Sequence, residues 1–304
     1  MESSHLSSRT TQLRVTACMR KWAKVIEIIR PGASAAQAKV VIFDFDGTLS
    51  LIRSGWMDVM VPMCVEELAA TGTAESKEEL TATVEEFVWR LTGKETIYQM
   101  MALADAVSAR GATPCEPRVY KKRYLDSLTL RIGDRLADLR EKRVDPVRYL
   151  VPGSRKLLER LVSRGLTLYL ASGTDHANVK EEAELLDVAH FFGPRIFGAQ
   201  DDLKSFSKAI LVQRILSQAS FRPAELLVFG DGYVEVEEVK KAGGTAVGVA
   251  TAEPDCLTID DWKRQRLIQV GADFVVPNYV NLDELDRVVL GGRECVEPVV
   301  ASVS

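Results

Sequence analysis

The sequence has no long apolar run. No stretch approaches the ~20 consecutive apolar residues that a membrane-spanning helix requires. The first residues of the chain also lack the apolar block of a secretion signal. These two absences predict a protein that has no membrane partner.

Patterns that would indicate a disulfide framework or a cysteine- or histidine-bound metal are also lacking. The chain contains five cysteines and three histidines, and neither set has the spacing of a metal site. The odd number and scattered positions of the cysteines favour a reduced, cytoplasmic setting, in which most of them are small buried side chains. The cysteines are Cys18, Cys64, Cys115, Cys256 and Cys295.

The charge of the chain argues against a nucleic-acid partner. The net charge is −4, and basic residues are not concentrated as they are on a nucleic-acid-binding face. Apolar residues make up 46% and charged residues 27%, which is ordinary for a soluble globular protein with an ample core. A length of 304 residues is typical of two domains.

Strand-like and helix-like segments alternate along most of the chain, with one long exception. Residues 39–43 are mostly apolar and rich in β-branched side chains, which predicts a strand buried on both faces of a parallel sheet. Residues 53–149 show helical patterns only, including a capping box that begins at Ser76. We therefore expect a helical insertion between the first strand and the rest of the core.

The alternation resumes at residue 150, and we expect four more strands, at 166–171, 225–229, 246–249 and 274–276. Strands that alternate with helices imply right-handed crossovers and a parallel sheet. A short amphipathic helix is also expected at 20–30, before Pro31 and Gly32. The predicted organisation begins with a partly disordered leader at 1–38. A Rossmann-like α/β core follows in two pieces, at 39–52 and 150–290, with a helical cap at 53–149 between them. A C-terminal tail covers 291–304.

Polar residues follow three of the predicted strands. In open parallel sheets, ligands bind beyond the carboxyl ends of the strands. The polar groups at three strand ends are therefore expected to converge on one edge, together with Lys208 from the helix before the third of these strands. The three segments are Asp44-Phe45-Asp46-Gly47-Thr48, Ser172-Gly173-Thr174 and Gly230-Asp231-Gly232.

These residue types suit a phosphate and a magnesium ion. Crowded carboxylates repel one another and need a cation, and the oxygens of Asp44, Asp46 and Asp231 are hard ligands that suit Mg²⁺. Ser172 and Lys208 offer hydrogen-bond donors for phosphoryl oxygens. Taken alone, Asp231 or Ser172 could equally be a turn residue or a helix cap. That reading is weaker for two aspartates directly after a buried strand and before Gly-Thr.

The chain resembles the haloacid dehalogenase-like superfamily, and within it the phosphatase branch. Asp44-Phe45-Asp46-Gly47-Thr48-Leu49 matches the first motif of that family in full. Ser172-Gly173 is similar to the second motif, Lys208 to the third and Gly230-Asp231-Gly232 to the fourth. The insertion at 53–149 resembles the first cap type of the family.

The resemblance implies a role for each motif residue. Asp44 would be the nucleophile that forms an aspartyl-phosphate, and Asp46 would protonate the leaving oxygen and later activate water. Mg²⁺ would lie on the Asp44 carboxylate, the Asp46 backbone carbonyl and Asp231. Thr48, Ser172, Gly173 and Lys208 would bind the phosphate. The dehalogenase branch lacks the second aspartate of the first motif, which this chain has at Asp46.

Two positions leave alternatives open. The fourth motif usually has a second aspartate, and this chain offers Glu235. Its side chain is one methylene longer, which suggests that its carboxylate contacts the residues that bind the metal and not the metal itself. Lys204 is a rival to Lys208 for the third motif. We favour Lys208 because it leads directly into the apolar, periodic part of its helix.

The sequence therefore predicts a magnesium-dependent phosphohydrolase acting on a small phosphorylated metabolite, of the sugar-phosphate or phosphoglycolate type. The alternatives are a phosphomutase of the same superfamily and a phosphate-binding regulatory module without turnover. We expect residues 53–149 to set substrate choice. The basic and aromatic segment at 262–266 is interpreted as a solvated helix face, with contact to substrate or to another helix as the alternative.

Overall fold

A computed structural model describes residues 26–200, 207–218 and 221–292. Its centre is a seven-stranded sheet with the strand order β1-β7-β6-β5-β2-β3-β4, in which only β1 runs antiparallel to its neighbour. This confirms the predicted α/β fold with a largely parallel sheet. The strands are β1 (Glu27–Ile28), β2 (Val40–Phe43), β3 (Thr167–Asp175), β4 (Ile196–Ala199), β5 (Leu226–Gly230), β6 (Thr245–Val249) and β7 (Phe274–Val276).

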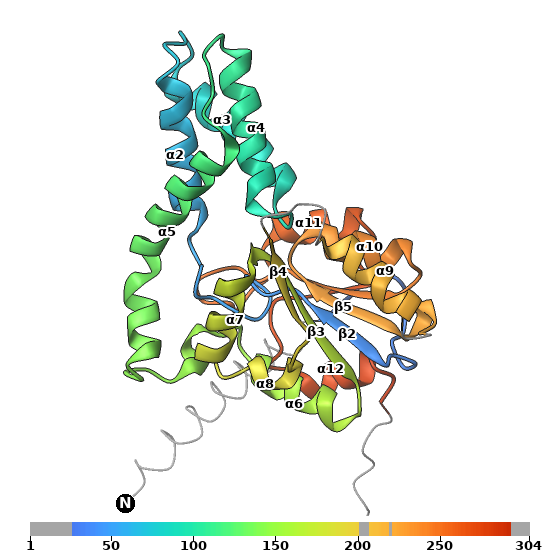
Figure 1. Ribbon diagram of the computed structural model, residues 1–304. Helices are drawn as coiled ribbons and strands as arrows, with labels where there is room; N and C mark the ends of the chain where they lie inside the picture. The colour runs from blue at the N-terminus through green and yellow to red at the C-terminus, as the bar shows by residue number, and fades with distance from the viewer. Residues whose placement is uncertain (1–25, 201–206, 219–220, 293–304) are drawn as a thin grey trace, which may run out of the picture.

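Helices cover both faces of the sheet (Figure 1). Alternate residues of β2 face opposite sides, so Val41 and Phe43 belong to one apolar cluster whereas Val40 and Ile42 belong to the other. The sheet is thus the middle layer between two cores. The helices of the α/β part are α6 (Ser154–Ser163), α7 (His176–Leu185), α8 (Ala189–Phe192), α9 (Lys208–Gln218), α10 (Tyr233–Lys241), α11 (Asp261–Gln269) and α12 (Leu282–Val288), with 3₁₀ turns at Pro146–Tyr149 and Pro223–Glu225.

Four helices between β2 and α6 form a separate layer that stands beside the core in Figure 1, and we call them the cap. They are α2 (Met57–Ala69), α3 (Lys77–Leu91), α4 (Thr96–Ala109) and α5 (Pro117–Arg140). The predicted capping box begins α3: Ser76 Oγ accepts the Glu79 N–H, and the Glu79 carboxylate accepts the Ser76 N–H. None of the helices in the described residues is long and apolar enough to cross a membrane.

The structure corrects the expectation for the N-terminal segment. Residues 20–30 were expected to form a helix, of which 20–25 lie outside the described residues. Glu27 and Ile28 instead pair with Val275 and Phe274 as the antiparallel edge strand β1. The β-branched run Ile26-Glu27-Ile28-Ile29 favours a strand once a sheet edge is available, and that edge comes from a strand almost 250 residues away. The short elements α8 and β4 were not predicted.

Candidate active site

The loop after β2 turns back sharply at the carboxyl edge of the sheet. The Asp44 N–H donates to Phe229 O (2.9 Å), which continues the pairing of β2 with β5 past the end of the strand. Phe45 is fully buried, and its carbonyl accepts the N–H groups of Leu49 and Ser50. Gly47 has φ +75°, and a Cβ there would lie 2.2 Å from Asp231 Oδ2. Glycine is therefore needed both for the turn and for the close approach of Asp231.

Two buried ion pairs that share Lys208 link the first, third and fourth motifs. Lys208 Nζ lies 2.6 Å from Asp44 Oδ1 and 2.8 Å from Glu235 Oε2, and all three residues are buried. Burial raises the pKa of the Asp44 carboxyl well above its usual value, whereas the Lys208 ammonium acts against this shift. Burial alone would lower the pKa of Lys208, but the Asp44 and Glu235 carboxylates outweigh it and raise that pKa. The lysine therefore remains a cation beside Asp44.

Asp46 sits among hydroxyl donors from β3. Its Oδ2 accepts hydrogen bonds from Ser172 Oγ (3.2 Å) and Thr174 Oγ1 (2.8 Å). Its Oδ1 is buried and has no hydrogen-bond partner among the described residues, with Arg53 Nε at 3.8 Å. Burial raises the pKa of the Asp46 carboxyl, whereas Arg53 and the two hydroxyls lower it. Asp46 can therefore hold a proton at a higher pH than an exposed aspartate does.

The fourth motif completes an acidic cluster. Asp44, Asp231 and Glu235 each offer an oxygen atom, and these three oxygens lie within 4.8 Å of one another. Such a set of hard carboxylate oxygens fits Mg²⁺. Both oxygens of Glu235 already accept hydrogen bonds, from the Gly232 N–H (2.8 Å) and from Lys208. Its carboxylate thus caps the first turn of α10 and holds Lys208.

Of the two other residues that were predicted to bind phosphate, Gly173 lines the cavity between the core and the cap, and Thr48 does not. Thr48 is fully buried, its hydroxyl accepts the Asp231 N–H (3.0 Å), and its carbonyl accepts the Tyr279 hydroxyl (3.0 Å). It joins the first and fourth motifs and does not line the cavity that lies between the core and the cap. Gly173 does line the cavity, and a Cβ there would lie 2.7 Å from Lys94 O of the cap.

A cavity of about 100 Å³ lies between the core and the cap. Asp44, Asp46, Ser172, Lys208 and Asp231 line its core side, so the structure brings these predicted residues together. The cap and its entry segment supply the other wall, which sequence reasoning did not identify. That wall consists of Arg53, Trp56, Met60, Thr92, Gly93, Lys94, Thr96, Gln99 and Tyr124.

Arg53 is the most consequential of the residues that the sequence did not reveal. Its guanidinium is buried and binds Glu182 of α7 through Nη2 (2.6 Å) and Nε (3.1 Å). Burial raises the pKa of Glu182, and the Arg53 charge opposes that shift. The partners are 129 positions apart, so no local pattern indicates the pair. The role of Thr174 could have been found from the sequence, because it directly follows the Ser-Gly pair of the second motif.

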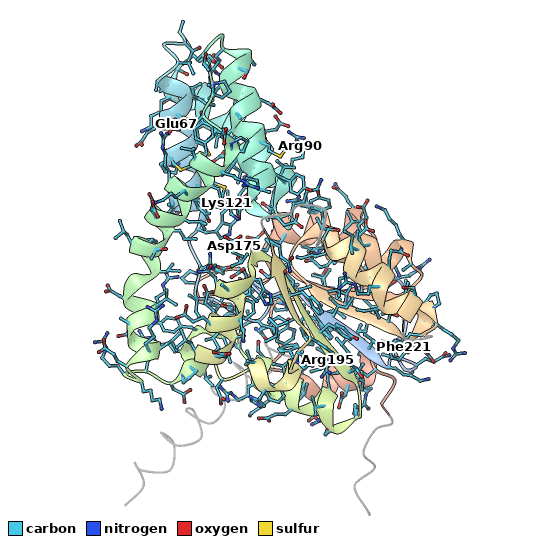
Figure 2. All side chains as sticks on the ribbon, in the orientation of Figure 1. Glu67, Arg90, Lys121, Asp175, Arg195 and Phe221 are labelled. Carbon is cyan, nitrogen blue, oxygen red and sulfur yellow. The ribbon has the colours of Figure 1, made fainter. Side chains whose placement is uncertain are left out.

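Several contacts hold the cap against the core, and one of them is the ion pair between Arg140 of α5 and Glu181 of α7 (2.7 Å). Figure 2 shows Lys121 of α5 and Asp175 at the end of β3 near each other where the two layers meet, and their side chains form an ion pair of 2.5 Å. On the other side, the rings of Trp89 and Trp262 are 4.0 Å apart. Arg266 Nη2 donates to the carbonyls of Arg90 (3.1 Å) and Thr92 (3.4 Å).

These contacts correct the interpretation of residues 262–266 as a solvated helix face. The segment lies in α11, where Trp262 and Arg266 contact α3 and the loop after it. Lys263 points to the active site instead, and its Nζ lies 3.0 Å from Asp231 Oδ2. The prediction was wrong because a run of hydrophilic side chains in a helix resembles a solvated face in the sequence, and the partners of this run are distant along the chain.

The arrangement defines a class of enzyme: a Rossmann-like core with a helical cap, and an aspartate pair at the end of the first core strand. The chain belongs to the haloacid dehalogenase-like hydrolase family, whose model matches residues 38–243. This confirms the family that the motifs predicted. None of the curated protein sequences matches the chain significantly.

Solved structures show the same fold at low sequence identity. A predicted phosphoglycolate phosphatase from Haemophilus somnus has 18% identity and a TM-score of 0.55, with 82% of this chain and 98% of that chain covered. A predicted phosphatase from Clostridium acetobutylicum has 16% identity and a TM-score of 0.52, with coverages of 81% and 97%. CbbY from Rhodobacter sphaeroides, solved in complex with xylulose-(1,5)bisphosphate, has 17% identity and a TM-score of 0.51, with coverages of 81% and 96%.

Proposed function

We propose that this protein is a magnesium-dependent phosphatase that hydrolyses the phosphomonoester of a small metabolite through an aspartyl-phosphate on Asp44. The observation that carries the proposal is the pairing of two different aspartates in one cavity. Asp44 is held by a cation, Lys208, which favours its ionised form. Burial raises the pKa of both carboxyls, so their partners distinguish them: Asp46 accepts hydrogen bonds from the neutral hydroxyls of Ser172 and Thr174, which favour an ionised carboxylate less than an ammonium group does and so suit a proton donor.

In the first step, the Asp44 carboxylate attacks phosphorus while the bond from phosphorus to the leaving oxygen breaks. Asp46 gives its proton to that oxygen, so the product leaves as a neutral alcohol. In the second step, Asp46 takes a proton from water, and the resulting hydroxide attacks the phosphorus of the aspartyl-phosphate. The bond from phosphorus to the Asp44 oxygen breaks, inorganic phosphate is released, and the free Asp44 carboxylate and the protonated Asp46 are regenerated.

The metal would be held by Asp44, Asp231 and the Asp46 backbone carbonyl. When bound, it offsets the charge of the phosphoryl oxygens and orients the phosphate. Ser172 and Lys208, which line the cavity, would donate to the phosphoryl oxygens. The clustered carboxylate oxygens support this assignment.

The cap wall of the cavity favours an uncharged, hydroxylated leaving group. Arg53, the buried cation of this wall, is engaged by Glu182 through two of its nitrogens. A carboxylate on the substrate would have to compete with Glu182 for that charge, and the exposed cation of the wall, Lys94, lies over the Tyr98 ring with its Nζ 5.5 Å from the ring centre. Trp56, Met60 and Tyr124 supply an apolar surface, and Gln99 supplies an amide. We therefore place small sugar or polyol phosphates before phosphoglycolate as substrates.

A substrate panel tests this proposal. The purified protein should release phosphate from one or more small sugar or polyol phosphates in the presence of Mg²⁺, with kcat/KM above that for phosphoglycolate. Phosphate release is measured for each compound at equal concentrations. A protein that releases no phosphate from any compound on the panel, or that transfers it to another hydroxyl of the same substrate, would contradict a phosphatase function.

Removal of the metal should lower kcat by at least about a hundredfold. Two like unit charges ~4 Å apart repel by about 4 kcal/mol at an effective dielectric constant of 20, and a carboxylate that attacks a phosphate dianion meets at least that barrier. The measurement is phosphate release after exhaustive EDTA treatment and again after Mg²⁺ is restored. Full turnover in the metal-free protein would rule out the metal-dependent mechanism.

Lys208→Ala should lower kcat by about 10²–10³-fold, because a buried cation beside the nucleophile and the phosphate is lost. Lys204→Ala, at the rival position that lies outside the described residues, should leave kcat near the wild-type value. Steady-state kinetics of the two variants, with thermal melting as a check on folding, decide between them. Equal kinetics, or the reverse order, would overturn the choice of Lys208.

A further inference from the structure

Lys263 is a partly buried cation for which the proposed reaction has no role. It lies on α11, where the side chain of Asp260 caps the helix by accepting the Lys263 N–H (2.8 Å). Its Nζ lies 3.0 Å from Asp231 Oδ2 and 3.4 Å from Glu253 Oε1, and its side chain is 17% exposed. Its ammonium group therefore faces two carboxylates, one of which is the proposed metal ligand Asp231.

Lys208 and Lys263 divide the acidic cluster between them. Lys208 binds Asp44 and Glu235, which leaves Asp231 as the third carboxylate of the cluster. Lys263 binds Asp231 and comes from α11, which follows Asp231 in the sequence and is not part of the family motifs. The lysine therefore offsets the charge of the same carboxylate that the metal would use.

We propose that Lys263 is a resident cation that competes with Mg²⁺ for Asp231, so that it weakens metal binding and stabilises the site when the metal is absent. The inference rests on the proposed metal-dependent function. A monovalent cation within contact distance of a metal ligand repels a divalent ion and draws negative charge away from it. The same cation relieves the repulsion among Asp44, Asp231 and Glu235 that the metal-free protein would otherwise bear.

Lys263→Met is the direct test, because methionine has a similar length and no charge. We expect its dissociation constant for Mg²⁺ to be about tenfold lower than that of the wild type or lower still, measured by titration calorimetry. Its Tm without metal should fall, and Mg²⁺ should raise its Tm more than it raises the wild-type Tm. Unchanged or weaker Mg²⁺ binding by the variant would overturn the inference and would mark Lys263 as a residue that only positions Asp231.

Lys241→Met is a matched control. Lys241 also contacts two carboxylates, Glu237 (3.0 Å) and Glu238 (3.1 Å), but it lies on the surface of α10 with 58% of its side chain exposed. This variant should bind Mg²⁺ with the wild-type dissociation constant. If it binds as tightly as Lys263→Met does, the effect comes from the overall charge of the protein and the inference fails.

Glu253→Gln provides a second arm with the opposite sign, which also serves if Lys263→Met does not fold. Without Glu253, Asp231 is the one carboxylate partner that Lys263 keeps among the described residues, so Mg²⁺ should bind several-fold more weakly than to the wild type. In the Lys263→Met background the same change should have a much smaller effect, as a double-mutant cycle measures. If Mg²⁺ does not bind the wild type at all, the proposed function fails; if it binds and neither variant shifts the constant, only this inference fails.

Discussion

Replacement of Asp44 by asparagine is expected to lower kcat by more than about 10⁴-fold and to leave the protein folded. The amide is nearly isosteric with the carboxylate but is a poor nucleophile, so the aspartyl-phosphate cannot form. The fold should persist because Lys208, which lies 2.6 Å from Asp44, keeps Glu235 as its second partner at 2.8 Å. The measurement is phosphate release by the variant, with circular dichroism and Tm to establish that it is folded.

Asp44→Glu is a useful companion variant. It keeps the charge and the chemical type of the nucleophile but moves the carboxylate by one methylene, and small displacements from the reactive geometry are costly. It should therefore also be strongly impaired. A folded Asp44→Asn protein that turns over at a rate near that of the wild type would end the covalent hypothesis.

Asp46→Asn is expected to lower kcat by about 10²–10⁴-fold, the usual contribution of a proton donor and acceptor. The amide can still accept hydrogen bonds from Ser172 and Thr174, so the local structure should be kept. Kinetics with alkyl phosphates, whose alcohols are poor leaving groups, measure the loss of the acid.

The dependence on the leaving group separates a chemical role from a structural one. Aspartyl-phosphate formation from p-nitrophenyl phosphate needs little protonation of the leaving oxygen, so this step should be impaired less in the Asp46→Asn protein than the same step with an alkyl phosphate. Single-turnover kinetics isolate that step. Equal losses for the two substrates would show that Asp46 supports the site without acting as the acid.

Local patterns in the sequence determined the main architecture. The buried run of β2, followed by Asp44 and Asp46, needs no distant partner to be recognised, because its signal lies within about ten consecutive residues. The capping box at Ser76 is local in the same way. The alternation of strands and helices then places the polar ends of parallel strands at one edge of the sheet. The family, the fold class and the convergence of the motif residues follow from such signals.

Tertiary structure alone decided which residues surround those motifs. Glu27 and Ile28 became a strand because β7 offered an edge, and their own sequence was compatible with a helix. The ion pairs of Arg53 with Glu182 and of Lys263 with Asp231 join segments that are distant along the chain. A buried charge must find a partner, but which partner it finds depends on how helices pack against the sheet. The sequence by itself therefore determined the reactive groups, whereas packing determined the charges that tune them.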